Sequence, residues 1–516
     1  MNLIDFFDKS VALTPQRNCI LAGDRRWTYA EVSEISTRIG HGLRAAGVQR
    51  ETKCAVVSRN DPFAFMSMLG ILKAEATWVP LNPVNATDEN LYMLDFFDVE
   101  VLFFQKESAS FVEIVRQQLP KVRHFFCVDG AVDGAPSVEA WSAQQSADPI
   151  VLQWQPDAVC WLRGTGGTTG RPKGVMNTNR NFETTIANFL ARVRFDSPPV
   201  QLAAAPLSHA AGVLAMINIA LGGTLVIQRA FDAQATLKAI EEHRISWLYL
   251  PPTALYGLLS QPNVREFDYS SLRHFIYGAA PSAQSKLIEA FGVFGPVLTQ
   301  AYGQTELPTS VTYLGPEDCV DAQGKVIEKR LLSCGRPSPF ARVALMDENG
   351  EIVPRGEIGE ICVQGGLRMK GYYKNPEATA AAGVHGWHQT GDLAWQDEDG
   401  FIYICDRKKE MIITGGYNVY PLEVEQVVLS HTSVQDCAVV GVPDAKWGES
   451  IKAVVELKPG AQLVAEELLA MCRERLGAVK TPKSVDIVQE LPRSPAGKVL
   501  RKSVRSKYWE GQTRNV

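Results

Sequence analysis

The sequence has few features of a secreted, metal-binding or nucleic-acid-binding protein. Its ten cysteines are scattered and include no Cys-x-x-Cys pair, so neither a zinc motif nor a disulfide framework is indicated. A formal net charge of -5 over 516 residues gives no broad attraction for nucleic acid or anionic lipid. We therefore expect a cytoplasmic protein, in a reducing compartment, with no nucleic-acid partner.

Targeting and membrane-spanning segments are also lacking. The first ten residues, MNLIDFFDKS, have no basic region followed by an apolar one, so no secretory signal is expected. One apolar stretch, residues 210–227, is broken by Gly222-Gly223, and TLVI after the break has the character of a strand. We predict a buried helix followed by a strand there, and no transmembrane segment.

The hydrophobic pattern predicts an α/β protein with more than one domain. The chain is long, and its hydrophobic content of 46% is enough for a large core. Short β-branched or aromatic runs alternate with amphipathic stretches, which favours layers with mainly parallel sheets. These runs are KCAVVS near 53, VEVLFF near 99, HFFCVD near 124, AVCWL near 158, TLVIQ near 224, SWLYLP near 246 and HFIYG near 274.

The pattern changes twice toward the C-terminus. Between about 340 and 405, Asn-Gly and Asp-Gly turns separate strand-like runs, so a small antiparallel β unit is expected there. After DRKKE, residues 406–410, the rest of the chain has an αβ pattern of its own. We predict a large N-terminal domain over residues 1–405 and a small α+β domain over residues 411–516.

A glycine-rich stretch, TGGTTGRPKGV, occupies residues 165–175 and follows the apolar run AVCWL. It could be a mobile surface loop, since these are ordinary loop residues. It could also be a phosphate cradle, in which backbone N–H groups and threonine hydroxyls face anionic oxygens and Lys173 supplies positive charge. It matches neither the P-loop pattern nor the dinucleotide-binding fingerprint.

Eight stretches, in order, decide between these readings, because together they resemble the adenylate-forming superfamily of acyl-CoA synthetases, amino-acid adenylation domains and luciferases. The resemblance covers nearly the whole chain and is greatest to a bacterial acyl-CoA synthetase. The stretches are TGGTTGRPKGV (165–175), PLSHAAG (206–212), YGAAP (277–281), AYGQTE (301–306), TGD (390–392), DRKKEMIITGGYNVYP (406–421), VPDAKWGES (442–450) and PRSPAGKVLRK (492–502).

The resemblance implies a carboxylic acid–CoA ligase that works in two steps. A carboxylate attacks the α-phosphate of Mg-ATP to give acyl-AMP and pyrophosphate, and the thiol of coenzyme A then displaces AMP to give a thioester. The implied partners are a small-molecule carboxylic acid, ATP and CoA, with Mg²⁺ as the metal. The implied ATP-binding residues are Thr165, Gly166, Gly167, Thr168, Thr169, Gly170, Lys173, Gly278, Ala279, Ala280, Pro281, Tyr302, Gly303, Thr305, Asp392 and Arg407.

The resemblance implies three catalytic groups, and their chemical types suit the charges of the first step. Carboxylate and triphosphate repel each other, so cations and oriented donors are needed where charge develops. By resemblance, Lys498 bridges the carboxylate and the α-phosphate, Glu306 binds Mg²⁺ as a hard oxygen ligand, and His209 borders the acyl carboxylate. Asp392 is expected to accept hydrogen bonds from both ribose hydroxyls.

The second step implies a mobile C-terminal domain. In the superfamily this domain rotates about a hinge residue two positions after a motif arginine, which here is Arg407, so Lys409 is the expected pivot within residues 406–410. The thiol of CoA is then expected to pass Gly415 and Gly416, where side chains would block it. Trp447 is a candidate contact for the CoA nucleotide.

The sequence departs from the superfamily pattern at four positions. Gly166 replaces a serine that would face phosphate, and Glu75 replaces the usual glycine of LKAEATWVP. Val479 stands where an aromatic residue often stacks on the CoA adenine, and Thr481 where an arginine can bind phosphate. The last two weaken the case for CoA as the thiol.

Other functions remain open from sequence alone. An amino-acid adenylation enzyme that loads a carrier protein is one, although PLSHAAG lacks an acidic residue for a substrate amine. Luciferase-type oxidation shares the adenylation motifs, and a nucleotide-binding protein without catalysis would keep the ATP site. The acid could be aromatic or fatty, and a monomer or a homodimer is plausible. AMP formation with and without CoA discriminates among these functions.

Overall fold

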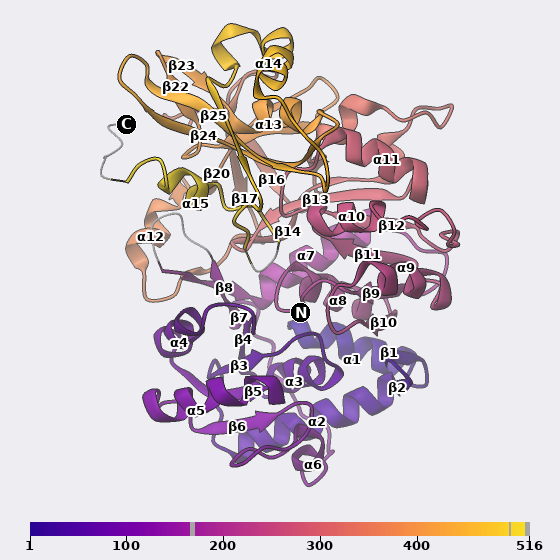
Figure 1. Cartoon of the computed structure of the whole chain (residues 1–516). Helices are drawn as coiled ribbons and strands as arrows, with labels where there is room; N and C mark the ends of the chain where they lie inside the picture. Colours follow the sequence, from indigo (N-terminus) through magenta and orange to yellow (C-terminus); the bar gives the residue numbers. More distant parts are fainter. Residues whose placement is uncertain (166–170, 495–496, 511–516) are drawn as a thin grey trace.

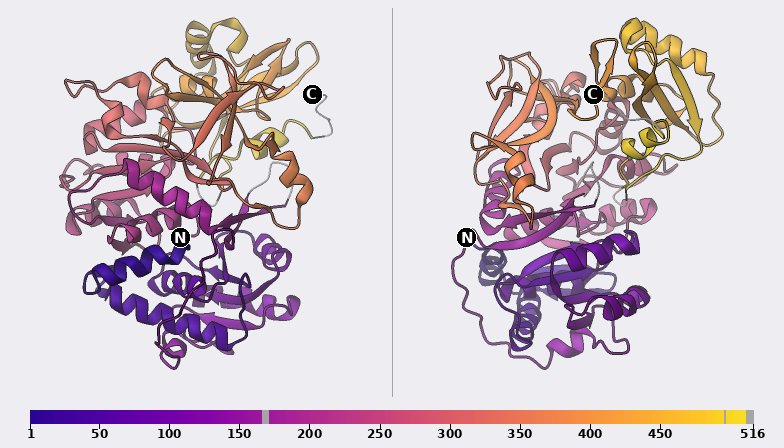
Figure 2. Two further views of the ribbon diagram at one scale, coloured as in Figure 1. Left: turned by 180° about the vertical axis from the view of Figure 1, so that it is seen from behind. Right: turned by 90° about the vertical axis from the view of Figure 1, so that its left-hand side faces the viewer.

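The chain forms two large sheets, a small antiparallel sheet and a C-terminal unit with a sheet of its own (Figure 1). The structure, a computed structural model, describes residues 1–165, 171–494 and 497–510. Figure 2 shows the orange antiparallel region and the yellow C-terminal region standing over the indigo and magenta body of the protein. Within the described residues, no helix is long and apolar enough to cross a bilayer.

The first large sheet has seven strands among the described residues. Its order is β18 (Gly371–Tyr372), β8 (Lys173–Thr178), β7 (Val159–Thr165), β4 (Thr77–Leu81), β3 (Lys53–Val57), β5 (Val99–Phe104) and β6 (His124–Cys127). The strands from β7 to β6 are parallel, whereas β7 and β8 form an antiparallel hairpin around the glycine-rich stretch. Its helices are α2 (Tyr29–Ala45), α3 (Pro62–Lys73), α4 (Thr87–Phe96), η1 (Lys106–Ser108), α5 (Ala109–Gln118) and α6 (Val138–Ser142).

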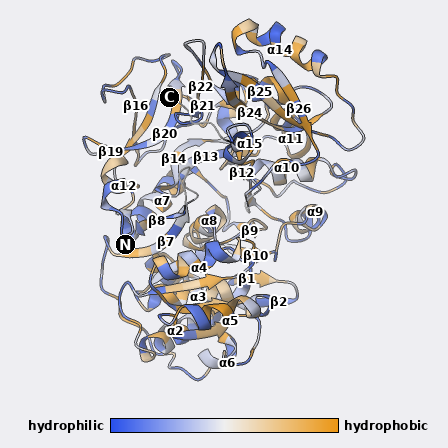
Figure 3. Ribbon diagram, turned by 60° about the vertical axis from the view of Figure 1, so that its left-hand side comes forward, coloured by the Kyte–Doolittle hydropathy of each residue, from blue (hydrophilic) through white to orange (hydrophobic). Residues whose placement is uncertain are grey.

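Helix α3 shows how the sequence fixes one of these elements. Asp61 caps the helix by accepting from the N–H of Phe63 at 2.8 Å, and Pro62 occupies the first helical position, where no N–H is needed. Nearly every side chain of α3 is buried, so the helix is apolar all round and lies inside the core. Figure 3 shows hydrophobic colours around α3.

The second large sheet has nine strands among the described residues. Its order is β15 (Arg336–Pro337), β14 (Leu307–Leu314), β13 (Leu298–Gln304), β12 (His274–Tyr277), β11 (Trp247–Leu250), β9 (Val200–Ala203), β10 (Thr224–Ile227), β1 (Asn18–Ala22) and β2 (Arg25–Thr28). It is parallel from β13 to β1. Its helices are α1 (Leu3–Leu13), α7 (Asn179–Arg192), α8 (Ala210–Ala220), α9 (Ala233–Glu242), α10 (Pro252–Leu259) and α11 (Gln284–Phe294), with η2 (Pro316–Cys319) and η3 (Glu328–Leu332) after β14.

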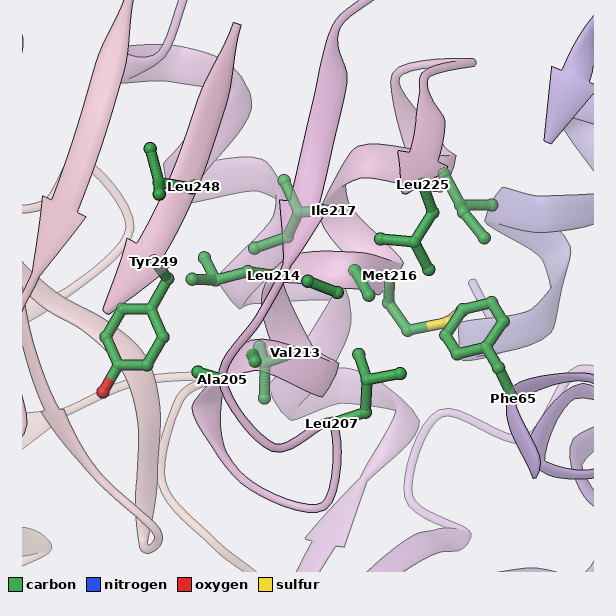
Figure 4. Close-up of a cluster of buried hydrophobic side chains, with 14 of the residues drawn as sticks. Phe65, Ala205, Leu207, Val213, Leu214, Met216, Ile217, Leu225, Leu248 and Tyr249 are labelled. Carbon is green, nitrogen blue, oxygen red and sulfur yellow. The ribbon is translucent and has the colours of Figure 1, made fainter. Parts of the chain in front are cut away.

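The apolar stretch 210–227 forms a buried helix followed by a strand, as predicted. Helix α8 ends before Gly222, whose φ of +67° reverses the chain into β10. Leu214 and Ile217 are fully buried and pack with Leu225 and Leu248 of the neighbouring strands (Figure 4). The hydrophobic content of this stretch therefore fills the core between helix and sheet.

The third sheet is the small antiparallel unit predicted near residues 340–405. Its strands are β16 (Arg342–Met346), β17 (Gly359–Gln364), β19 (Gly383–Val384), β20 (Trp387–Gln396) and β21 (Ile402–Arg407), and helix α12 (Pro376–Ala381) precedes β19. The Asp399-Gly400 turn joins β20 to β21, which confirms the hairpin expected there.

Residues from Ile412 onward have their own sheet and core. The strands are β22 (Ile412–Thr414), β23 (Tyr417–Val419), β24 (Val434–Asp444), β25 (Gly448–Leu457) and β26 (Ser484–Val488), and the helices are α13 (Pro421–Leu429), α14 (Ala465–Lys480) and α15 (Arg501–Ser506). The buried cluster between these elements includes Val424, Val439, Ile451 and Leu468. The mixed α/β class and the α+β C-terminal unit are as predicted.

Candidate active site

A cavity of about 820 Å³ lies between the second large sheet, the antiparallel sheet and the C-terminal unit. It opens at the carboxyl ends of parallel strands β11 and β12, where ligands bind in α/β proteins. The predicted site residues that line it are His209, Gly278, Ala279, Ala280, Pro281, Tyr302, Gly303, Asp392, Arg407 and Lys498. Residues more than 280 positions apart in sequence therefore meet in one cavity.

The Asp392 carboxylate contacts three donors in this cavity. One carboxylate oxygen, Oδ2, accepts from the Tyr302 hydroxyl at 2.6 Å and from Gln304 Nε2 at 2.7 Å. The other, Oδ1, faces Arg407 Nε at 2.6 Å. A carboxylate has about four acceptor positions, so these contacts leave room for one more donor, and two ribose hydroxyls would displace one of the present donors.

Burial and neighbouring charges shift the pKa values of the groups that contact Asp392. Burial and the Asp392 carboxylate raise the pKa of Tyr302 well above its ordinary value, so its hydroxyl stays a donor. Burial lowers the pKa of Arg407, but the combined effect of Asp392, Tyr302, Glu410 and Glu306 outweighs it and the pKa is raised. Gln304 was missed from sequence, although it lies inside AYGQTE.

Glu306 lies in the turn between β13 and β14 and is held by a residue far along the chain. Its Oε1 accepts from the Tyr372 hydroxyl at 2.7 Å, and the ammonium of Lys173 lies 4.8 Å from the centre of the Tyr372 ring. Tyr372 is there because β18 pairs with β8. The predicted phosphate-binding lysine and metal-binding glutamate are thus joined through one tyrosine.

The glycine-rich stretch is described only in part. Thr165 pairs with Lys173 at the end of the β7–β8 hairpin. The positions predicted to contact phosphate between them, Gly166, Gly167, Thr168, Thr169 and Gly170, lie outside the described residues. Thr305 is held nearby, because its carbonyl accepts from Asn177 Nδ2 at 3.0 Å.

Tight backbone packing explains two of the predicted glycines beside the cavity. A Cβ at Gly278 would lie 2.9 Å from the carbonyl of Ala301, and one at Gly303 would lie 2.6 Å from the carbonyl of Leu307. Ala279 has a φ of +67°, a region that L side chains rarely adopt. The chain is therefore held in a constrained path where it borders the cavity.

His209 precedes α8 and is joined by an arginine that sequence reasoning missed. His209 Nδ1 lies 2.9 Å from Ser208 Oγ. Burial lowers the pKa of His209 to about 4, and the guanidinium of Arg163 adds to the decrease. Burial also lowers the pKa of Arg163 to about 10 against the attraction of Glu306. The signal in the sequence is a single cation in the apolar run AVCWL-R.

This pKa predicts how His209 affects stability as pH falls. An unfolded histidine gains its proton near pH 6.5, but folded His209 gains it only near pH 4. Between these values the unfolded state binds more protons, so His209 makes the protein less stable as pH falls from 6.5 to 4. The difference in free energy of unfolding between wild type and His209→Asn should fall from pH 7 to pH 5 in urea titrations. A constant difference would contradict the lowered pKa.

Lys498 reaches the cavity from the C-terminal unit. Its carbonyl accepts from the N–H of Ser494 at 2.7 Å, which closes a turn, and a Cβ at Gly497 would lie 2.8 Å from Thr253 Oγ1 of α10. Burial and the guanidinium of Arg407 lower the pKa of the Lys498 amine. The structure therefore places this amine in the same cavity as Asp392.

The residues predicted for CoA are not among the described residues that line the cavity. Gly415 and Gly416 form the two-residue turn between β22 and β23, with φ values of +57° and +83°. Such turns require positive φ at both positions, so the turn alone explains both glycines. Trp447 is 44% exposed and packs on Gly415, where a Cβ would lie 2.5 Å from its ring.

The structure describes the surroundings of three other departures, Glu75, Thr481 and Val479. Glu75 has a φ of +61°, which explains why glycine suits this position, and its carboxylate contacts Arg50 at 2.9 Å and Arg44 at 3.4 Å. The hydroxyl of Thr481 donates to the carbonyl of Gly477 at 2.6 Å, so it is occupied within α14. Val479 is 41% exposed.

Comparisons with known proteins identify the family to which the chain is similar. Residues 7–373 match the family of AMP-binding enzymes, and residues 423–498 match the C-terminal domain of AMP-binding enzymes. The chain is 37% identical to a medium/long-chain-fatty-acid–CoA ligase, FadD8 of Mycobacterium tuberculosis, over 96% of this chain and 88% of that protein. It is also 37% identical to a feruloyl-CoA synthase of Amycolatopsis, over 96% and 97% of the two chains.

Two solved structures share the fold over nearly the whole chain. One is the amide bond synthetase McbA of Marinactinospora thermotolerans, with a TM-score of 0.89, 29% identity, and coverage of 98% of this chain and 100% of that one. The other is the anthranilate CoA ligase AuaEII in complex with anthranoyl-AMP, with a TM-score of 0.90, 25% identity, and coverage of 98% and 97%.

Proposed function

The chain belongs to the family of AMP-binding enzymes, and on that premise we propose how its residues carry out the reaction of an acid–CoA ligase. The enzyme uses ATP to convert a carboxylic acid to acyl-AMP with release of pyrophosphate, and CoA then displaces AMP to form the thioester. The observation that carries the residue assignment is the meeting of Lys498, Asp392, Arg407 and Tyr302 in one cavity.

Unpaired polar groups in the cavity support ATP as its ligand. The Tyr277 hydroxyl, Ser282 Oγ and Gln300 Oε1 are buried, line the cavity and have no hydrogen-bond partner among the described residues. A buried polar atom without a partner costs free energy, and a nucleotide supplies both donors and acceptors. We assign Asp392 to the ribose, and Lys173 with residues 165–170 to the phosphates.

The Mg²⁺ that accompanies ATP fits Glu306. No group of three or more His, Cys, Asp or Glu side chains that could hold a metal ion occurs among residues 1–165, 171–494 and 497–510, so the protein alone does not form a complete metal cage there. Mg²⁺ is commonly held by one or two carboxylates together with substrate phosphates and water. Glu306, beside Tyr372 and Lys173, suits this mode, and the bound ion would neutralise phosphate charge.

The second half-reaction requires the Lys498 turn to leave the carboxyl group that it covers. We propose that residues 406–410 are a hinge between residues 1–405 and 411–516, with Lys409 as the pivot. Lys409 lies in the turn between β21 and β22, the last link before the C-terminal sheet. Rotation there would carry Lys498 away and bring Gly415, Gly416 and Trp447 toward the site.

A reducing cytoplasm suits a chain with ten free cysteines.

For the acid, we propose a compact molecule, aromatic or of medium chain length. Near His209 the cavity is bordered by Ala205, Pro206 and Tyr249, and the side chains of Val213, Leu214 and Ile217 of α8 nearby are buried in the core (Figure 4). Gly212 does not widen the cavity, because a Cβ there would lie 2.1 Å from the carbonyl of Leu207. Leu307, which follows Glu306, packs in the core of the antiparallel unit and is not among the described residues that line the cavity.

The experiment is a panel of acids assayed for AMP release with and without CoA. We expect CoA-dependent AMP release to be fastest with cinnamate-like and benzoate-like acids or with octanoate. With palmitate, kcat/KM should be at least about tenfold lower, since even one extra methylene that a hydrophobic pocket does not accommodate can cost that much. Amino acids serve as the control for the carrier-loading alternative. A preference for palmitate would contradict the compact pocket, and AMP release unaffected by CoA would contradict the ligase.

A further inference from the structure

A cluster of buried charges joins the segment of Lys498 to the strand that precedes the proposed hinge. Arg501, the first residue of α15, donates from Nη1 to Asp406 Oδ1 and to Glu410 Oε2, both at 2.7 Å. Its Nε donates to Glu425 Oε1 at 2.7 Å, and its Nη2 also contacts Glu425. Asp406 is 4% exposed and Glu425 6%, so salt and water screen these contacts little.

The carboxylates of the cluster lie on opposite sides of Lys409. Asp406 is the last residue but one of β21 and precedes Arg407, which contacts Asp392. Glu410 and Glu425 follow Lys409 in sequence, and Glu425 belongs to α13 of the C-terminal unit. Asp406 Oδ2 also accepts from the N–H of Leu422 at 2.7 Å. Asp406 of β21 therefore accepts from two donors of the C-terminal unit, Arg501 and Leu422.

These contacts set the position of Lys498. The N–H of Leu500 donates to the carbonyl of Pro492 at 2.8 Å, and the N–H of Ser494 donates to the carbonyl of Lys498 at 2.7 Å, so the turn and the start of α15 form one compact piece. Arg501 ties this piece to Asp406, while the adjacent Arg407 is tied to the proposed ribose site. Lys498 and Arg501 are three residues apart. The Arg501–Asp406 ion pair therefore links the segment of the Lys498 amine to β21, whose Arg407 contacts Asp392 at the proposed ribose site.

We propose that Asp406 is a positioning residue for Lys498, because its ion pair with Arg501 holds the Lys498 amine in the cavity during acyl-adenylate formation. The inference rests on the proposed two-step function and hinge. Rotation at Lys409 separates Asp406 from Arg501 and Leu422, whereas Glu410 and Glu425 move with Arg501 and keep its charge paired. The ion pair thus favours the first half-reaction and must break for the second.

The test is Asp406→Asn, which keeps an acceptor for Leu422 but removes the charge that faces Arg501. Acid-dependent ATP–pyrophosphate exchange should fall by about tenfold or more, while the rate of thioester formation from a supplied acyl-adenylate and CoA stays at or above the wild-type rate. Asp406→Glu, which restores the charge, should recover most of the exchange. The matched control is Asp486→Asn, which removes a carboxylate 2.7 Å from Lys452 within the C-terminal unit and should alter neither half-reaction.

Three results would overturn the inference. One is an equal fall of both half-reactions in a folded Asp406→Asn protein, as a purely structural role predicts. Another is unchanged exchange in that variant. If Asp406→Asn does not fold, Arg501→Lys replaces it, since lysine keeps the charge but its single nitrogen cannot contact Asp406, Glu410 and Glu425 as the guanidinium does, and equal losses of both half-reactions count against the inference there too. Absence of exchange in the wild-type protein would instead overturn the proposed function, and the inference with it.

Discussion

Replacing Lys498 by alanine should reduce acyl-adenylate formation by about a hundredfold to a thousandfold, which is the usual loss for one oriented donor at a developing charge. The amine lines the cavity with Asp392 and Arg407, and Arg407 is already paired. We therefore expect Lys498 to bridge the carboxylate and the α-phosphate, whose mutual repulsion opposes the reaction. Once acyl-AMP exists, the bond that Lys498 helps to form is complete.

The two half-reactions should therefore separate in the Lys498→Ala variant. ATP–pyrophosphate exchange measures the first, and thioester formation from chemically supplied acyl-adenylate measures the second, which should keep most of its wild-type rate. Lys502→Ala is the matched control, because Lys502 is an exposed lysine of the same segment. Undiminished exchange in Lys498→Ala would remove this residue from the chemistry.

The fold was largely predictable because its signals are local. Alternating apolar runs gave the strands of both large sheets, and Asp399-Gly400 gave the β20–β21 hairpin. The order of strands was not predictable in the same way. The pairing of β18 with β8, nearly 200 residues apart, leaves no local trace, yet it places Tyr372 between Lys173 and Glu306.

The same difference between local signals and long-range pairing applies to the candidate site. Motifs identified Asp392, Tyr302 and Arg407 one by one, but their mutual contacts depend on a register between β13, β20 and β21 that no motif encodes. The sequence did not identify Arg163 as a site residue, because its proximity to His209 depends on which side of β7 faces α8. The role of Gly415 and Gly416 in passing the thiol stays a prediction, and the positive φ values of their turn favour glycine at both positions independently of that role.

Replacing Glu306 by glutamine should slow acyl-adenylate formation by about a hundredfold or more, because stabilising charge on a transferring phosphoryl group is worth several kcal/mol. Glutamine has nearly the shape of glutamate and can still accept from the Tyr372 hydroxyl, so the turn between β13 and β14 should be preserved. What is lost is the negative charge that attracts Mg²⁺. The variant should accordingly need a higher Mg²⁺ concentration to reach half of its own maximal rate.

A matched control separates the charge from the hydrogen bond. Tyr372→Phe removes the donor 2.7 Å from Glu306 but leaves the carboxylate and the ring that faces Lys173. If the carboxylate binds the metal, Tyr372→Phe should lower the rate only a few-fold, about the worth of one hydrogen bond to a charged group, and should shift the Mg²⁺ dependence little. Exchange rates measured across a Mg²⁺ titration distinguish the two variants. Equal losses in both, with the same Mg²⁺ dependence as the wild type, would mean that Glu306 serves to anchor Tyr372, and the metal would have to be held by phosphates and water without it.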